Sequence, residues 1–264
     1  MEPVLMNVAN REINLLKMKI LRVASEVREG HIPSSFSILD LLWNIFENFE
    51  LKVSRSESQG AYFILSKGHA SIGLYAILFN FGFIDEQTFN SYCRKGSALG
   101  GHPDKNKVPG VMASTGSLGH GFPIAIGVAY ARKLTKVEAP VIVLLGDGEL
   151  NEGTIWESAL LANQHQLMNL ICIVDNNLSS SRALKLNDIS EKFIAFGWQS
   201  IEIDGHNHSE ILGALKTRRV KPLVIVANTI KGKGLRAMEN NPEWHHKFPT
   251  PSQVQEFLGE LDEE

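Results

Sequence analysis

Short apolar runs alternate with stretches of helical periodicity along most of the chain. The apolar runs predict buried strands at 62–65, 141–145, 170–174 and 223–227, and 198–203 predicts a further strand. Helical patterns occupy 124–134, 209–217 and the interval between the strands at 141–145 and 170–174. The repeated strand–helix order predicts an α/β fold, with a doubly wound, mostly parallel sheet and helices on both faces. No repeat or low-complexity linker divides the chain, so we interpret 1–264 as one domain.

The part of the chain before residue 121 combines helices with loops. An amphipathic helix is expected first, ending at Gly30, and Ser37 is expected to cap the next helix. The strand at 62–65 leads into the polar sequence Ser66-Lys67-Gly68-His69, and 94–121 is rich in Gly, Pro and Ser. Such a long irregular segment is typical of a binding loop. The apolar positions that define the two helices are Ile13, Leu16, Ile20, Val23 and Val27 in the first and Ile38, Leu41, Leu42 and Phe46 in the second.

Polar residues end two of the predicted strands. The run at 141–145 closes with Gly146-Asp147-Gly148, and the run at 170–174 closes with Asp175-Asn176-Asn177, which puts Asn177 thirty residues after Asp147. Strands of a βαβ unit open on the same edge of the sheet, so the Asp147 carboxylate and the Asn177 amide oxygen should converge. Two hard oxygen donors, with space for water and phosphate oxygens, predict a Mg²⁺ site that also holds a diphosphate.

Composition narrows the class of protein. The chain has 264 residues, of which 44% are hydrophobic, and a net charge of −3, so it has a globular core and no basic footprint for nucleic acid. No apolar run reaches the roughly 18 residues that a membrane span requires. The first residues lack a basic start followed by an apolar core, so no secretory signal is expected, and Cys93 and Cys172 are too few for a disulfide framework. We therefore expect a cytoplasmic protein without nucleic-acid or membrane partners.

The spacing of Asp147 and Asn177 resembles the thiamine-diphosphate motif, a GDG followed about thirty residues later by NN. The flanking sequences resemble the transketolase family in particular, and they occur in family order along nearly the whole chain. The resemblance implies the thiamine-diphosphate-binding fold and, within it, the diphosphate-binding domain. The matching positions are Gly30-His31, Ser66-Lys67-Gly68-His69-Ala70, Gly101-His102-Pro103, Ser114-Thr115-Gly116-Ser117-Leu118-Gly119, Asp147-Gly148-Glu149-Leu150-Asn151-Glu152-Gly153, Asp175-Asn176-Asn177, Asp204-Gly205-His206 and Trp244-His245.

The resemblance also implies roles for individual residues. The metal, Mg²⁺ or another divalent cation such as Ca²⁺ or Mn²⁺, would be held by Asp147, Asn177 and the backbone carbonyl of Ser179. His31 and His102 would line the substrate channel, His245 would serve both cofactor and catalysis, and Glu152 would belong to a proton relay between paired active sites. The cofactor would be contacted by His69, Gly116, Leu118, Gly148, Asn177 and His245.

Simpler interpretations of these residues stay open. The histidines would then be surface residues of loops, Asp147 a helix cap, Asn177 part of a turn, and Glu152 a carboxylate in the first turn of a helix. His120 and His246 depart from the family pattern. The roles of His206 and of the loop Lys231-Gly232-Lys233-Gly234, which is either a phosphate-binding loop or a solvated turn, also stay open.

The activity implied by the resemblance is ketol transfer. A complete transketolase also has a pyrimidine-binding domain and a C-terminal domain, and we expect a second polypeptide to supply them in an assembly with two copies of each chain. The expected protein is thus the N-terminal subunit of a two-chain enzyme that moves a two-carbon unit from a ketose to an aldose. Alternatives are the α-type subunit of a 2-oxo acid dehydrogenase, a 1-deoxyxylulose-phosphate-synthase-like half, a fragment of a longer enzyme, and a cofactor-binding assembly subunit without turnover. The sequence does not identify the sugars.

Overall fold

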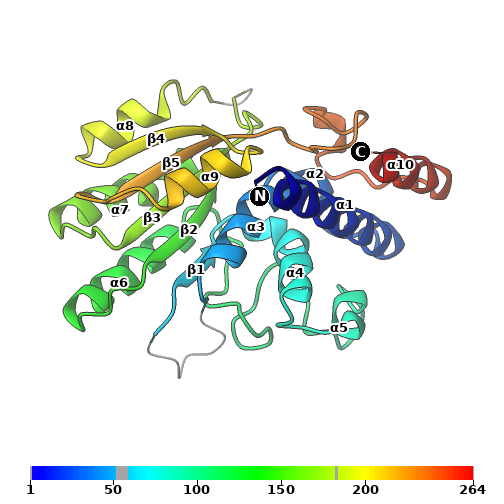
Figure 1. Cartoon of the computed structure of the whole chain (residues 1–264), viewed down its shortest axis with the longest axis horizontal. Coiled ribbons are helices and arrows are strands. Elements are labelled where there is room, and N and C mark those ends of the chain that lie inside the picture. Colours follow the sequence, from blue (N-terminus) through cyan, green and yellow to red (C-terminus); the bar gives the residue numbers. More distant parts are fainter. Residues whose placement is uncertain (1, 52–58, 182–183, 264) are drawn as a thin grey trace.

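The centre of the molecule is a parallel β-sheet. The computed structural model describes residues 2–51, 59–181 and 184–263, with side chains from residue 8 onward. Its five strands lie in the order β1-β2-β3-β5-β4, and every neighbouring pair is parallel. This arrangement confirms the predicted α/β fold (Figure 1). The strands are β1 Tyr62–Leu65, β2 Val141–Gly146, β3 Leu170–Asn176, β4 Gln199–Asp204 and β5 Leu223–Asn228.

Helices cover both faces of the sheet, as expected. Successive residues of a strand point to opposite faces, so Ile142 and Leu144 enter one apolar core while Val143 and Leu145 enter the other. The first core is shared with α1, α3, α4 and α9, and the second with α6, α7 and α8. The α-helices are α1 Glu2–Val27, α2 Ile32–Phe36, α3 Leu39–Asn48, α4 Ser71–Asn80, α5 Glu86–Asn90, α6 Gly121–Leu134, α7 Gly153–Gln164, α8 Ile189–Ala195, α9 His208–Leu215 and α10 Pro251–Glu263.

The last helix of the described chain, α10, packs beside the first helix, α1. Helix α10, red in Figure 1, lies beside the blue α1. Phe257 and Leu261 of α10 are buried, and the ring of Phe257 packs edge-on against Trp244 with centroids 5.5 Å apart. Within the described part of the chain, none of the helices has the length and apolar character needed to cross a bilayer.

One local prediction was wrong. Ser37 does not cap α3, because it follows the short helix α2, which the pattern did not predict. The N-cap position of α3 is Ile38, without a side-chain hydrogen bond. The hydroxyl of Ser37 donates instead to the carbonyl of Ser34 at 3.0 Å and to the Asp175 carboxylate at 2.9 Å. A contact across 138 residues of sequence thus replaces the local cap.

Candidate active site

The polar ends of β2 and β3 meet at one edge of the sheet. The two strands pair in register, with Gly146 opposite Asp175, so Asp147 and Asn177 leave the sheet side by side. The amide nitrogen of Ser179 donates to the side-chain oxygen of Asn177 at 3.1 Å, and the hydroxyl of Ser179 lies 3.4 Å from the Asp147 carboxylate. Asp147 and Asn177 are 4% and 6% exposed. The two predicted oxygen donors therefore converge around Ser179, as the strand-end argument requires.

These residues open into a pocket of about 430 Å³. Every residue that the sequence singled out for metal, cofactor or substrate lines this pocket, except Glu152. Sequence reasoning assigned no role there to Ser34, Lys67, Gly146, Glu149 or Ser180 and left Lys231 open. The predicted residues that line it are His31, His69, His102, Gly116, Leu118, Asp147, Gly148, Asn177, Ser179 and His245.

A buried ion pair lies beneath the ends of β2 and β3. Lys67 Nζ lies 2.5 Å from Oδ2 of Asp175, and the two side chains are 1% and 0% exposed. The same carboxylate accepts hydrogen bonds from Ser37, from the Asn177 side-chain amide at 2.9 Å, and from Thr229. Because the Asn177 amide nitrogen donates to Asp175, the Asn177 oxygen is left to accept from the backbone nitrogen of Ser179. Asp175 therefore fixes the orientation of the Asn177 side-chain amide.

A second buried carboxylate ties the glycine-rich loop to the sheet. Glu149 accepts hydrogen bonds from the hydroxyl of Ser66 at 2.6 Å and from the backbone nitrogens of Gly119 at 2.9 Å and Gly146 at 3.0 Å. Burial raises the pKa of Glu149, although these donors act in the opposite direction. Since Ser66, Gly119 and Gly146 belong to three separate segments, Glu149 fixes their mutual positions around the pocket.

His31 lies at the centre of a group of imidazole rings. The ring centroids of His69, His245 and His246 lie 5.2, 5.5 and 4.9 Å from that of His31. Burial, followed by the charges of His246 and His245, lowers the pKa of His31 to about 4. Burial and the neighbouring Lys67 lower the pKa of His69 to about 2. Both imidazoles are therefore neutral at neutral pH, where each can donate one hydrogen bond and accept another.

Lys231 places a positive charge in the pocket. Its Nζ lies 2.9 Å from Nδ1 of His245. Because an ammonium group only donates, Nδ1 of His245 accepts, and the ring proton of His245 resides on Nε2. Burial and the charge of Lys67 lower the pKa of Lys231 to about 8, so the side chain stays mostly protonated at pH 7. The loop that the sequence left open between two interpretations thus contributes a cation to the site.

Close backbone approaches explain two of the glycines. A Cβ atom on Gly68 would lie 2.8 Å from the backbone nitrogen of Gly116, and one on Gly116 would lie 2.9 Å from the ring of His102. The absence of side chains at Gly68 and Gly116 therefore allows the loop before α4 and the 94–121 segment to approach this closely. This contact brings His69 and His102 to the same pocket.

Glu152 and His120 lie outside the pocket. Glu152 is the exposed N-cap residue of α7, and its side chain makes no capping hydrogen bond. It lies against Gly119, because a Cβ atom added to Gly119 would be 2.6 Å from the Cβ atom of Glu152. Its predicted relay role stays a prediction. His120, which departs from the family pattern, is exposed and contacts the carbonyl of Leu118 through Nδ1 at 3.0 Å.

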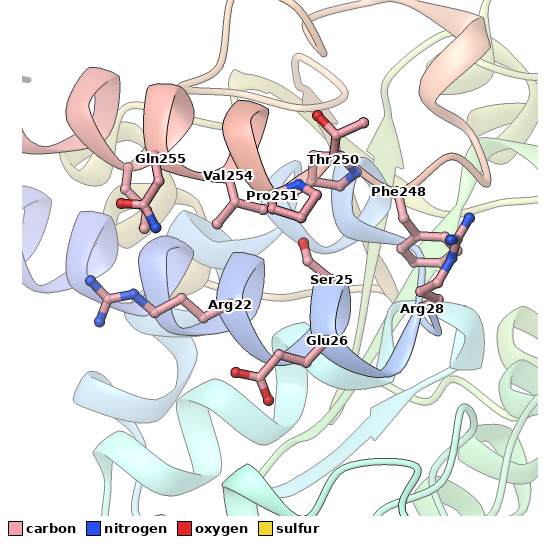
Figure 2. A pocket seen from close by; sticks show the side chains of 11 residues that line it. Arg22, Ser25, Glu26, Arg28, Phe248, Thr250, Pro251, Val254 and Gln255 are labelled. Carbon is pink, nitrogen blue, oxygen red and sulfur yellow. The ribbon is translucent and has the colours of Figure 1, made fainter.

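A larger hollow, of about 640 Å³, lies between α1 and α10 (Figure 2). Arg22 and Ser25 of α1 line one side, and Pro251 and Val254 of α10 line the other. None of the predicted site residues borders this hollow. Its larger volume therefore does not make it the candidate active site. The smaller pocket at the sheet edge has the convergent polar groups and perturbed histidines that characterise functional sites.

The residues of the sheet-edge pocket fit a divalent cation bound together with a diphosphate. Within the described residues, no group of three or more His, Cys, Asp or Glu side chains could hold a metal. A cation between Asp147 and Asn177 would therefore need further oxygens from the backbone, from water and from a ligand. Mg²⁺ bound through one or two protein side chains and phosphate oxygens has this coordination. The charge of Lys231 and the donors of the histidines suit the remaining phosphate oxygens.

Comparison with known proteins gives the family. The family described as "Transketolase, thiamine diphosphate binding domain" matches residues 8–253. The chain therefore belongs to the transketolase family and comprises its thiamine-diphosphate-binding domain, as the sequence resemblance implied.

Relatives resemble the chain over most of its length. It is 33% identical, over 258 residues, to an apulose-4-phosphate transketolase subunit of Phocaeicola vulgatus, covering 94% of this chain and 91% of that one. It is 41% identical, over 245 residues, to the protein of the same name from Actinobacillus succinogenes, covering 89% and 88%. The fold matches the Campylobacter jejuni transketolase with a TM-score of 0.83 at 24% identity. That match covers 97% of this chain and 46% of the C. jejuni chain, so this chain spans about half the length of that enzyme.

Proposed function

We propose that this chain is the N-terminal subunit of a two-chain transketolase that depends on thiamine diphosphate and a divalent cation. The observation that carries the proposal is the convergence of Asp147, Asn177, Lys231 and the histidines on one pocket at the ends of β2 and β3. Two relatives of nearly equal length are named as single subunits of a transketolase, which supports the division into two chains.

In this proposal the cation, Mg²⁺ by preference, binds the carboxylate of Asp147, the amide oxygen of Asn177 and the backbone carbonyl of Ser179. Asp175 holds the Asn177 amide in the required orientation. His69, His245 and the backbone of Gly148 donate to the cofactor diphosphate, joined by Lys231. Gly116 and Leu118 contact the aminopyrimidine end through the backbone of their loop.

Thiamine diphosphate, when bound, supplies the nucleophilic carbon that takes up and releases the two-carbon unit. The protein binds and orients the cofactor and the sugar. His31 and His102 hold sugar hydroxyl groups, and a neutral His31 can donate one hydrogen bond to a hydroxyl and accept another. Its pKa of about 4 keeps it neutral at the pH of the cell. His245 serves both the cofactor and the sugar, because its Nδ1 accepts from Lys231 and its Nε2–H can donate to a ligand in the pocket.

The second chain supplies the pyrimidine-binding and C-terminal domains, and the assembly contains two copies of each. Obligate contacts of this kind usually bury more than about 2,000 Å² in total. The identity of the sugars depends on the partner chain. Native mass spectrometry of the co-expressed chains should give a mass equal to two copies of each, and a stable one-to-one complex would contradict this stoichiometry.

Calorimetric titration tests cofactor binding directly. Thiamine diphosphate titrated into the assembled protein should bind with Mg²⁺ present and lose nearly all affinity after chelation with EDTA, with Ca²⁺ or Mn²⁺ restoring it. Thiamine without its diphosphate should bind far more weakly, because the cation and Lys231 act on the phosphates. Equal affinity with and without a divalent cation would contradict the proposed site.

A further inference from the structure

A polar cluster lies outside the pocket, between α3 and the loop that joins β4 to α9. Both oxygens of Asp40 are engaged, one by Nδ1 of His206 at 2.7 Å and the other by Nε2 of His208 at 3.1 Å. The three side chains are between 9% and 12% exposed. Burial alone would raise the pKa of Asp40, but the two imidazole donors outweigh it and hold the pKa well below its usual range. Asp40 is therefore a stable carboxylate that orients both rings.

The partners of each ring determine its tautomer. The backbone N–H of Ile230 donates to Nε2 of His206 at 2.9 Å, so the ring proton of His206 is on Nδ1 and points to Asp40. The side-chain amide of Asn44 donates to Nδ1 of His208 at 3.1 Å, so that ring presents its proton to Asp40 from Nε2. The two histidines share one carboxylate. The second ring nitrogen of His208 contacts the side chain of Asn44, whereas that of His206 accepts from the backbone of the loop that contains Ile230.

That loop delivers Lys231 to the pocket. Ile230 directly precedes Lys231, and the following residue, Gly232, donates its N–H to the carbonyl of Pro33 at 3.0 Å. Lys231 is thus held from both sides, by His206 before it and by the start of α2 after it. Lys231 is 7% exposed, and its Nζ donates to Nδ1 of His245.

We propose that His206, oriented by Asp40, is a positioning residue that fixes Lys231 for the ligand phosphates. The inference rests on the proposed function, because it assigns Lys231 to the bound diphosphate. It gives a role to the His206 of the Asp204-Gly205-His206 segment, which lines no part of the pocket. Losing the acceptor at Nε2 leaves the Ile230 N–H without this partner, so the backbone next to Lys231 loses one of its anchors and the Lys231 ammonium is held less firmly in one place.

The test compares variants that separate the two ends of the His206 ring. His206→Asn keeps a donor at the position of Nδ1 for Asp40 but is too short to accept from Ile230, whereas His206→Gln can reach Ile230. His208→Ala is the matched control, since it removes the other donor to Asp40 from an equally buried site. Affinity for thiamine diphosphate with Mg²⁺ is measured by calorimetry on the assembled protein, together with amide exchange of the 229–235 peptide.

We expect His206→Asn to weaken binding by about 10- to 100-fold, the usual effect of losing a residue that orients a ligand. His206→Gln and His208→Ala should stay within about threefold of the wild type, a change worth less than about 0.7 kcal/mol. In a Lys231→Met background, His206→Asn should cause no further loss, because Lys231 carries the effect. Exchange of the Ile230 amide should accelerate only in His206→Asn.

Two results would overturn the proposal. Equal weakening by His206→Asn and His208→Ala would make the cluster merely structural, and a full additional loss in the Lys231→Met background would separate His206 from Lys231. The exchange measurement needs no cofactor. If the wild type failed to bind thiamine diphosphate, the proposed function would fail, and the Ile230 exchange rates would still decide whether His206 holds the loop.

Discussion

Replacing Asp175 by asparagine should destabilise the folded chain by about 3–5 kcal/mol, the cost of leaving one charge of a buried ion pair without its partner. Asp175 is fully buried and its partner Lys67 is 1% exposed, so water does not compensate the remaining ammonium. Asparagine has almost the same shape, so no cavity adds to the effect. The side-chain oxygen of the new asparagine can still accept from Asn177. The variant therefore removes the negative charge while the Asn177 amide keeps its orientation.

The chain provides its own control for this magnitude. Arg94 and Glu26 lie 2.6 Å apart, nearly the same separation, but their side chains are 52% and 63% exposed. Glu26→Gln should therefore cost less than about 1 kcal/mol, as is usual for surface pairs. The difference between the two variants in the free energy of unfolding therefore measures how much burial adds to the value of an ion pair when the N···O distance is nearly the same.

Urea unfolding at pH 7 is the assay, with the single variants, the surface control and the double variant Lys67→Met/Asp175→Asn. The double variant should recover most of the loss, because neither charge is then buried without a partner. An Asp175→Asn protein within about 1 kcal/mol of the wild type, or a double variant that loses the sum of the two single effects, would refute the argument.

Further predictions concern the pocket itself. Asp147→Ala and Asn177→Ala should each abolish Mg²⁺-dependent cofactor binding in calorimetry of the assembled protein, because Mg²⁺ tolerates few changes of geometry; either variant binding at wild-type affinity would contradict the metal assignment. His31→Ala and His102→Ala should lower kcat at least tenfold while cofactor affinity changes little, since their contacts strengthen in the transition state; unchanged steady-state kinetics would make them structural residues. The pKa of His69 is about 2 in the folded chain and roughly 6.5 in the unfolded one, so the unfolded chain binds the proton first. The contribution of neutral His69 to the free energy of unfolding is then fully present above about pH 6.5 and falls by about 2 kcal/mol between pH 7 and pH 5. Urea unfolding should find the pH dependence of the wild type reduced by about this amount in His69→Gln, while the part due to His31, whose pKa is lowered to about 4, remains.

The sheet and its polar edge could be predicted from the sequence because both depend on local patterns. Buried parallel strands are continuous apolar runs, and the runs at 141–145 and 170–174 became the central strands β2 and β3. The parallel pairing of those strands then places Asp147 and Asn177 together, whatever the surrounding loops do. The helix α2 was missed because its five residues are too few to show a periodicity.

The residues that support the pocket could not be predicted in the same way. Asp175 and Glu149 look like ordinary charged residues in the sequence, and their partners lie between 2 and 138 residues away. Only tertiary structure shows that each collects several donors. The one local signal is that Lys67 and Asp175 follow or end buried strands, where a charged residue must find a partner. Ser37 illustrates the same limit, since its local pattern predicted a cap and its long-range contact to Asp175 prevailed.

Reconstitution of ketol transfer tests the central claim most directly. The purified chain and its C-terminal partner are assayed separately and mixed, with thiamine diphosphate, Mg²⁺, a ketose phosphate donor and an aldose phosphate acceptor. The account predicts no transfer from either chain alone, transfer from the mixture, and loss of that transfer when the chain carries Asp147→Ala. Robust transfer by this chain free of any co-purifying partner, or undiminished transfer with Asp147→Ala, would contradict it.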